Sequence, residues 1–366
     1  MEKAYKFRIY PNDKQEKLIN KTFGCVRFVY NRYLNKRIEV YKDTKENFSF
    51  NKCSADLTAL KKELEWLKEV DKFSLQNSLR DLDNAYKKFF KEGSGFPKFK
   101  SKKTSRLSYR TSFTNKNIDY VNGYIKLPKL GLIKTRDKHV LEGRILNATV
   151  SKSPSGKYFV SICSTDIEFN QLNKTGNSIG LDLGITDFCS LSNGEIVKNP
   201  KHLQKSLKKL AKLQRGLSRK SIGSSNRNKA RLKVARLSEH ISNQRKDFLH
   251  KLSKRLVVEN DVICIENLNI KSMLKNKQLS RSVSDVSWYE FTRQLDYKSR
   301  WYGKKVIKVD MYFASSQICS GCGHKNPITK DLSVREWTCT ECNTHHHRDI
   351  NASINILNEG LRLLEV

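Results

Sequence analysis

Two C-x2-C pairs constrain the fold of this chain more than any other feature. The first pair is Cys319 and Cys322, the second is Cys339 and Cys342, and 16 residues separate them. Each pair forms a tight turn that directs two thiolates at one point, and two such turns complete a tetrahedron with no open position. We therefore expect one structural Zn2+ in a small ribbon, rather than four cysteines without a metal or a catalytic metal.

A run of three histidines, His345–His347, follows the second cysteine pair. A second metal site is the alternative interpretation, but the first tetrahedron is already complete. We expect these histidines to contact phosphate or to support the zinc ligands. Lys325, Lys330 and Arg335 lie between or beside the cysteine turns and suit a ribbon that touches nucleic acid.

The charge of the chain indicates a polyanionic partner. Its 366 residues include 71 Lys and Arg against 37 Asp and Glu, a net charge of +34, which opposes compaction unless an anion offsets it. No apolar run reaches the roughly 18 residues of a membrane span, and the N-terminus lacks the apolar stretch of a signal peptide. Nine mostly scattered cysteines suit a reducing cytosol. We expect a cytoplasmic protein that binds nucleic acid and no membrane.

Half of that charge lies in one segment. Residues 198–256 hold 19 Lys and Arg and two acids, a net charge of +17. Leucines recur at helical spacing on both sides of a break at 221–225, which predicts two antiparallel amphipathic helices with basic outer faces. A solvated face or a membrane-surface helix is the alternative, but so few acids favour phosphate contact. The arginines expected to make such contacts are Arg215, Arg219, Arg227 and Arg231.

The N-terminal half changes its hydrophobic period once. Alternation over Tyr5–Ile9 predicts a strand, Asn12 is expected to cap a helix that ends at Gly24, and helical periodicity continues to about residue 90. A glycine-rich boundary at 93–95 precedes short strands that extend to about residue 167. If the first strand joins the same sheet, the helical part is an insertion within a β domain.

Strands and helices alternate in the second half, which predicts an α/β unit. We expect a hairpin from residues 178–183 and 187–192, strands at 262–265 and 305–309, and helices at 285–302 and 351–364. A chain of this length suggests two or three domains.

Three acids stand where these elements end or begin. Asp182 interrupts an apolar strand between Gly180 and Gly184, glycines that allow close approach of a backbone or a phosphate. Glu266 ends an apolar run, and Asp349 stands at the start of the last helix. Carboxylates that bridge two Mg2+ ions can activate water for phosphodiester hydrolysis, although each acid alone could be a cap or an ion-pair partner. His347–Asp349 is similar to the catalytic loop of protein kinases. The chain lacks the asparagine and the glycine-rich phosphate loop that a kinase needs, so we do not expect a kinase.

Taken together, these motifs resemble the TnpB family of RNA-guided nucleases from bacterial insertion sequences, which are relatives of compact type V CRISPR effectors. The resemblance rests on GLDLGI, CIENLN, two C-x2-C pairs and RDINASINI in that order, and on KAYKFRIYPNDKQEKL, SLQNSLRDLDNAYKKFF, GFPKFKSKK and SWYEFTRQLDYKSRWYGKKVIKVD. It covers nearly the whole chain.

The resemblance implies a multidomain α/β fold with four parts. A wedge β-barrel would comprise residues 1–11 and 93–172, interrupted by a helical recognition domain at 12–92. A RuvC-like nuclease domain of RNase H fold would comprise residues 173–318 and 346–366. A zinc ribbon at 319–345 would interrupt that domain and bind target nucleic acid.

The resemblance also implies an activity: guide RNA directs Mg2+-dependent cleavage of double-stranded DNA, as part of transposon-linked DNA recombination near the nucleoid. Asp182, Glu266 and Asp349 would hold two catalytic Mg2+, and one chain is expected per guide RNA. Many relatives have an acid immediately before the arginine of this motif, where this chain has His347. We expect that arginine, Arg348, to contact nucleic acid. A DNA transposase is one alternative, but the acids here follow the order Asp, Glu, Asp, whereas transposases usually present Asp, Asp, Glu. A non-cleaving guided DNA-binding protein is the other, and the complete set of three acids argues against it.

Recognition of a short motif beside the target is expected from the first half of the chain. Lys72 and Gln76 are four residues apart on one helical face, in a segment where the family places base contacts, and Gln can pair with an adenine edge. Thr114 and Asn115 are further candidates. Ordinary solvated surface residues are the alternative.

Overall fold

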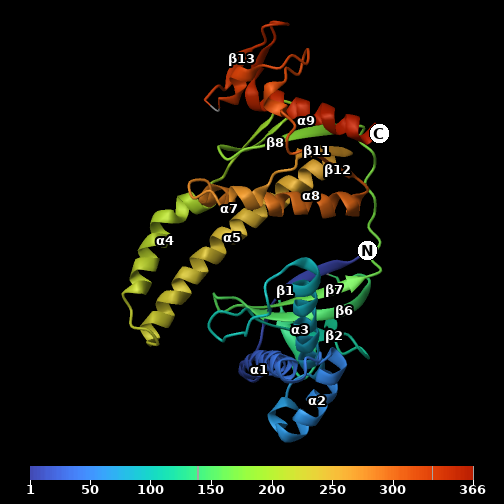
Figure 1. Ribbon diagram of the computed structural model, residues 1–366, viewed down its shortest axis with the longest axis vertical. Helices are drawn as coiled ribbons and strands as arrows, with labels where there is room; N and C mark the ends of the chain where they lie inside the picture. The colour runs from blue at the N-terminus through green and yellow to red at the C-terminus, as the bar shows by residue number, and fades with distance from the viewer. Residues whose placement is uncertain (138–139, 332, 366) are drawn as a thin grey trace. The chain divides into compact units, whose positions relative to one another are not determined.

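The computed structural model describes residues 1–137, 140–331 and 333–365. The chain divides into two compact units, Met1–Glu168 and the remainder from Phe169 (Figure 1). The division comes four residues before the expected boundary at 172, because Phe169 stacks on Trp301 at 4.6 Å and Leu172 N–H donates to the Tyr302 carbonyl. Among the described residues, no helix combines the length and the apolarity that crossing a membrane would require.

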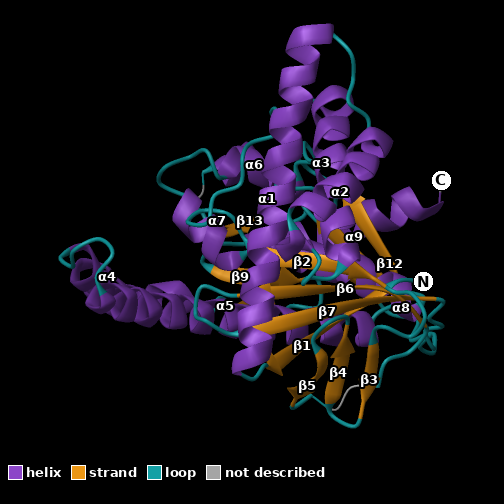
Figure 2. Cartoon of the chain, turned by 90° about the horizontal axis from the view of Figure 1, so that it is seen from below, coloured by secondary structure: helices purple, strands orange, loops and turns teal. Residues whose placement is uncertain are grey.

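The first unit contains one seven-stranded antiparallel sheet (Figure 2). Its strands are β1 (Lys3–Tyr10), β2 (Leu107–Ser112), β3 (Asp119–Val121), β4 (Tyr124–Leu127), β5 (Gly131–Thr135), β6 (Arg144–Lys152) and β7 (Tyr158–Thr165). The order β2-β6-β7-β1-β5-β4-β3 places β1 in the middle, so the first strand does join the later ones. The order has β2 and β3 at its ends, and closure into a barrel stays a prediction.

A helical segment separates β1 from β2. It comprises α1 (Asp13–Thr44), α2 (Phe50–Glu63), the 3-10 turn η1 (Glu65–Leu67) and α3 (Lys72–Glu92). Asn12 caps α1 as expected, with Gln15 completing a reciprocal capping box. The predicted end at Gly24 is wrong: α1 continues through it because Phe23, Cys25 and Val29 are buried and outweigh the roughly 1 kcal/mol helix penalty of glycine.

The second unit contains a five-stranded mixed sheet in the order β10-β9-β8-β11-β12. Its strands are β8 (Ser178–Leu183), β9 (Asp187–Leu191), β10 (Ile196–Lys198), β11 (Val262–Glu266) and β12 (Lys305–Val309). The expected hairpin of β8 and β9 is confirmed, β10 extends it, and β8, β11 and β12 run parallel.

Helices lie on both faces of this sheet. They are α4 (His202–Ser218), α5 (Ser225–Glu259), α6 (Ile270–Met273), α7 (Ser280–Val286), α8 (Trp288–Tyr302) and α9 (Arg348–Glu365), with 3-10 turns η2 (Ser315–Gln317) and η3 (Pro327–Lys330). Helices α5 and α8 build the larger core on one face, and α9 packs against the other. A two-stranded ribbon of β13 (Glu336–Thr338) and β14 (His345–His347) precedes α9.

The helices of the second unit agree only in part with those expected from the sequence. The predicted pair of antiparallel helices is confirmed as α4 and α5, which pack together (Figure 1). The helix expected at 285–302 is two helices, because Ser287 adopts φ +58° and breaks the path between α7 and α8. The last helix begins at Arg348 instead of residue 351, so Asp349 lies in its first turn.

Candidate active site and metal centre

Side-chain alternation along two neighbouring strands places two of the predicted acids on one face of the second sheet. The residues on either side of Cys264 enter the large core, whereas Cys264 itself packs against α9. Successive strand residues point to opposite faces, so Glu266 shares the face of Cys264, and Asp182 shares that of Gly180. The parallel register pairs Cys264 with Gly180, so the two acids follow at adjacent strand ends.

Gly180 explains how α9 approaches this face. A Cβ atom at position 180 would lie 2.0 Å from the backbone oxygen of Ser353 and 2.8 Å from Leu357, so a side chain would push the helix away. This close approach of another backbone is one of the two roles predicted for the glycines around Asp182. It brings the first turn of α9, with Asp349, to the ends of β8 and β11.

The three predicted acids line one pocket with a volume of about 390 Å³. Asp182 and Glu266 come from the strands, Asp349 comes from α9, and Ser315 and Arg335 complete the same wall. The structure thus brings together residues that lie 84 and 83 positions apart in the sequence. Their catalytic roles stay a prediction.

The pocket concentrates the negative charge of three carboxylates, which the two arginines of its lining, Arg335 and Arg348, offset only in part. Burial raises the pKa of Asp182 well above its usual range, and the charges of Glu266 and Asp349 raise it further against the opposing effect of Arg348 and Arg335. Burial also raises the pKa of Glu266, although the Ser315 hydroxyl donates a 3.0 Å hydrogen bond to it. Carboxylates in such surroundings fit a hard divalent cation such as Mg2+, which supplies the missing positive charge.

Arg335 and Ser315 are pocket residues that the sequence did not identify. Arg335 Nη1 lies 3.3 Å from Asp349 Oδ2, whereas the sequence placed it on the ribbon as a nucleic-acid contact. The pairing of β13 with β14 accounts for its position, since the Arg348 N–H donates to the Arg335 carbonyl. That pairing is not visible in the residue pattern. The guanidinium of Arg348 is buried and donates to the Asp331 carbonyl at 3.1 Å.

The four cysteines form a compact sulfur cluster that could hold a structural zinc ion. Their Sγ atoms all lie within 4.8 Å of one another, and the pairs Cys319–Cys342 and Cys322–Cys339 are both 3.6 Å apart. Zn–S bonds of about 2.3 Å in a tetrahedron place sulfurs about 3.8 Å apart, so the geometry fits. A contact with the Thr344 hydroxyl lowers the pKa of Cys342, whereas burial raises the pKa of Cys319 in the same cluster. Within the described ranges, these cysteines are the one group of three or more His, Cys, Asp or Glu side chains whose ligand atoms are close enough to hold a metal ion directly. The carboxylate oxygens of the three acids lie farther apart than that.

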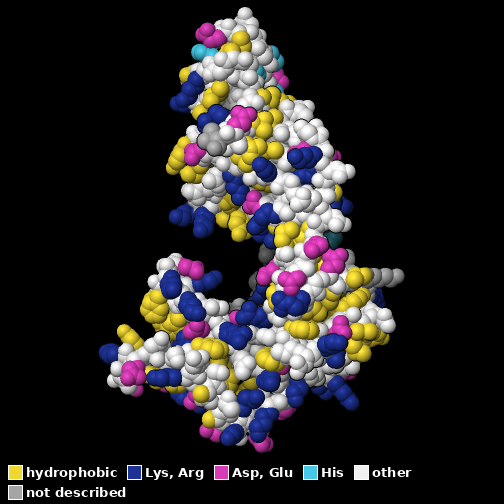
Figure 3. Space-filling view, turned by 90° about the vertical axis from the view of Figure 1, so that its right-hand side faces the viewer, with side chains coloured by type: hydrophobic (Ala, Val, Ile, Leu, Met, Phe, Trp, Pro, Cys, Tyr) yellow, Lys and Arg dark blue, Asp and Glu magenta, His cyan; other side chains and the backbone are white. Residues whose placement is uncertain are grey.

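His346 lies against this cluster. Its Nε2 atom is 3.0 Å from Cys319 Sγ, and its ring packs on Trp337 at 4.7 Å between centroids. Of the other two histidines, His345 lies 3.7 Å from Glu336, and His347 has a buried Nδ1 atom with no hydrogen-bond partner among the described residues. Histidines are visible at the tip of the second unit that carries β13 (Figures 1 and 3). Phosphate contact by the run stays a prediction.

The candidate readers of a flanking motif lie near one another. Lys72 and Gln76 are on the first turns of α3, and Thr114 and Asn115 follow β2, all of them at least partly exposed. Helix α3 is fixed to β2 by Asn77, whose amide donates to the Arg110 carbonyl at 3.1 Å and lies 3.2 Å from the Ser112 hydroxyl. No sequence pattern indicated this anchor, which holds the two candidate pairs on connected elements.

The four hairpin arginines differ in their surroundings. Arg215 and Arg231 are exposed on α4 and α5, and Arg219 is exposed immediately after the end of α4. Arg227 instead donates to the carbonyls of Leu217 at 3.1 Å and Lys220 at 2.7 Å, so its guanidinium closes the end of the hairpin. Lys and Arg side chains are spread over the visible surface of the molecule (Figure 3).

Three family profiles match parts of this chain. The family profile described as "Probable transposase" (OrfB, IS605) matches residues 159–277, and the one described as "Cas12f1-like, TNB domain" matches residues 288–356. An associated "Helix-turn-helix domain" profile matches residues 1–46, which fold here as β1 and the single helix α1.

Two relatives cover almost the entire chain. One from Streptomyces pristinaespiralis, provisionally named RNA-guided DNA endonuclease, is 42% identical over 99% of this chain and 90% of its own. The InsQ protein of Escherichia coli (strain K12), with the same provisional name, is 34% identical over 99% and 93%. The solved structure of Cas12f1 with sgRNA and target DNA shares the fold, with a TM-score of 0.59 at 14% identity over 98% of this chain and 99% of that one. On the strength of these long matches, the chain belongs to the TnpB (OrfB, IS605-type) family.

Proposed function

We propose that this protein is an RNA-guided endonuclease that cuts double-stranded DNA. The observation that carries the proposal is the convergence of Asp182, Glu266 and Asp349 on one pocket, where buried negative charge calls for divalent cations. The names of the two long relatives support the same activity. The net charge of +34 supports nucleic acid as the partner.

The residues of the pocket have separate tasks in phosphodiester hydrolysis. Two Mg2+ ions, when held by the three carboxylates, would supply an activated water and neutralise charge on the phosphate. Ser315 fixes the Glu266 carboxylate through its 3.0 Å hydrogen bond. Arg335 and the buried Arg348 place positive charge beside the pocket, where the phosphate would gain charge during attack. The expected products carry 5′-phosphate and 3′-hydroxyl ends, and a single pocket would cut the two strands in turn.

The remaining parts fit a division of labour in which base pairing reads the sequence and the protein reads shape. The sheet of the first unit would serve as the wedge domain, and α1–α3 as the recognition domain. The second unit would be the RuvC-like nuclease domain, with its ribbon stabilised by one Zn2+. The exposed arginines of α4 and α5 would hold the phosphates of the guide–target duplex, and the complex would act beside the nucleoid.

Recognition of a motif flanking the target is assigned to Gln76 and Lys72, with Thr114 and Asn115 beside them. Their exposure and the Asn77 anchor to β2 support this assignment. Selecting preferred motifs from a randomised library with the Gln76→Ala protein is the direct check. An unchanged preference would remove Gln76 from this role.

RNA that copurifies with the protein should distinguish the function from its alternatives. We expect a bound RNA whose variable end directs Mg2+-dependent cutting of a plasmid that carries the matching target. Bound RNA without Mg2+-dependent cutting would favour a non-cleaving guided binder. Strand joining without any RNA requirement would favour a transposase.

A further inference from the structure

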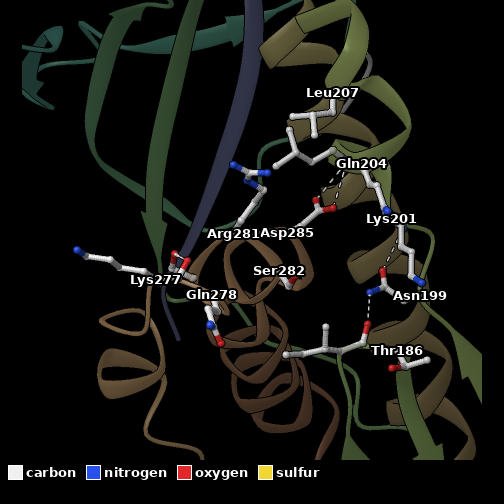
Figure 4. Close-up of a pocket in the computed structure, with 13 residues that line it drawn as sticks. Thr186, Asn199, Lys201, Gln204, Leu207, Lys277, Gln278, Arg281, Ser282 and Asp285 are labelled. Carbon is white, nitrogen blue, oxygen red and sulfur yellow. Dashed lines mark hydrogen bonds between the residues drawn. The ribbon is translucent and has the colours of Figure 1, made fainter. Parts of the chain in front are cut away.

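A second cavity of the second unit lies next to the nuclease pocket and has a volume of about 540 Å³. Three segments form it: the turn after β8, the start of α4 and the stretch from Lys277 into α7 (Figure 4). Its polar lining includes the amides of Gln204 and Gln278 and the hydroxyl of Ser282. This size and polarity suit a ligand no larger than one nucleotide.

The charge around this cavity favours an anion. Lys201, Lys277 and Arg281 line it, and none of the three has an ion-pair partner among the residues that the structure describes. The acid of the lining, Asp285, is already bound: Arg245 donates to it at 2.9 Å, and the backbone N–H of Leu203 lies 3.2 Å from it. The three cations are therefore available to a ligand, while the carboxylate is not.

The cavity is joined structurally to the nuclease pocket. Ile185 and Thr186, in the turn that follows the strand of Asp182, line both spaces. Asn199 holds this turn to the start of α4, because its amide donates to the Ile185 carbonyl at 2.7 Å and accepts from the Lys201 N–H at 3.0 Å. A DNA strand lying in the nuclease pocket would therefore continue past the basic side chains of this cavity, Lys201, Lys277 and Arg281.

We propose that this cavity binds a nucleotide of the DNA strand being cut, close to the phosphate that is hydrolysed. Lys201, Lys277 and Arg281 bind its phosphates, and the amides of Gln204 and Gln278 contact its base. The proposal rests on the proposed function, since it takes the strand in the nuclease pocket to be DNA. DNA is favoured over guide RNA because the shared turn makes the cavity continuous with the place of cutting.

The first test compares two double variants that remove equal charge from the same segment. Lys277→Gln with Arg281→Gln alters the cavity, whereas Lys271→Gln with Lys275→Gln alters exposed lysines outside its lining. Guide-loaded protein is saturated with target, and the single-turnover rate of cutting is measured at several salt concentrations. The cavity variant should cut about tenfold more slowly, as expected for the loss of a charge-assisted hydrogen bond. The slope of the logarithm of its cutting rate against the logarithm of salt concentration should fall by about 1.4. This value corresponds to two lost single-strand phosphate contacts at about 0.7 each.

Urea unfolding of both variants should match wild type, because the changed side chains are exposed. Target affinity should also match wild type, because the proposed function assigns the phosphates of the guide–target duplex to the arginines of α4 and α5, which neither variant alters. Equal cutting by the cavity variant and wild type would overturn this proposal and leave the nuclease function intact. Loss of target binding by the cavity variant would also overturn it, by assigning the cations to the guided duplex. Absence of guided cutting by wild type would instead refute the proposed function.

A crosslinking experiment tests which strand occupies the cavity. Photoreactive thymidine is placed next to the cut position of the DNA, in a complex with Asp182→Ala protein so that the strand stays whole. Adducts are expected in peptides that contain residues 199–207 or 277–285. Adducts of those peptides with a photoreactive guide RNA, and none with DNA, would contradict the proposal.

Discussion

The contact between Gly180 and α9 allows a quantitative prediction about how the site is positioned. In Gly180→Ala, the new Cβ would lie 2.0 Å from the Ser353 oxygen, whereas real contacts are no closer than 3.0 Å, so α9 must retreat by at least 1 Å. Overpacking of this kind costs about 1–3 kcal/mol of unfolding free energy. The retreat also moves Asp349 away from Asp182, and a 1 Å misplacement can slow a reaction about 100-fold.

Urea unfolding and single-turnover cutting measure the two effects. Gly24→Ala is the matched control, because a Cβ there meets nothing within 4 Å inside α1. This control should gain about 0.5–1 kcal/mol of stability and keep full activity. If Gly180→Ala were as stable and as active as wild type, the close approach of α9 could not be what positions the acids.

Three further predictions concern the metal, the hairpin and pH. Cys339→Ser should lose bound zinc, measured by elemental analysis, and should expose the ribbon to proteolysis while the first unit stays resistant. Arg215→Gln with Arg219→Gln should lower the salt slope of target-duplex binding by about 1.8, at about 0.9 per phosphate, with zinc content unchanged. Burial lowers the pKa of Lys298 to about 8, with Lys254 adding to the effect, so between pH 8 and 10.5 the unfolded chain binds more protons than the folded one. The contribution of this group to stability should therefore rise across that window by up to about 1.4 kcal/mol per pH unit, and the difference in unfolding free energy between wild type and Lys298→Met, measured with urea, should rise with pH.

Local patterns predicted the elements that hold the acids. The apolar run before Glu266 and the apolar segment that Asp182 interrupts indicated strands that β11 and β8 confirm. Two predicted helix boundaries were wrong. Helix α1 continues through Gly24, because packing outweighs the low helix preference of one glycine. The predicted helix at 285–302 is interrupted at Ser287, because a single positive φ breaks a helix whose side-chain pattern is continuous.

Features that depend on distant segments could not be predicted in this way. Arg335 reaches Asp349 only through the pairing of β13 with β14, and the basic cavity draws Thr186, Lys201 and Lys277 from three separate segments. Their arrangement follows from tertiary packing, and no spacing in the sequence encodes it. The four cysteines, by contrast, lie in two local turns whose spacing limits how they can meet.

Cutting by Asp182→Ala protein shows whether the three-carboxylate pocket hydrolyses DNA. The variant is loaded with its guide RNA and given a plasmid that carries the matching target and flanking motif, with Mg2+ present. Guide and target should bind as in wild type while cutting falls to background, because one of the three carboxylates that line the pocket is gone. Undiminished cutting by this variant would show that Asp182 is not needed for hydrolysis.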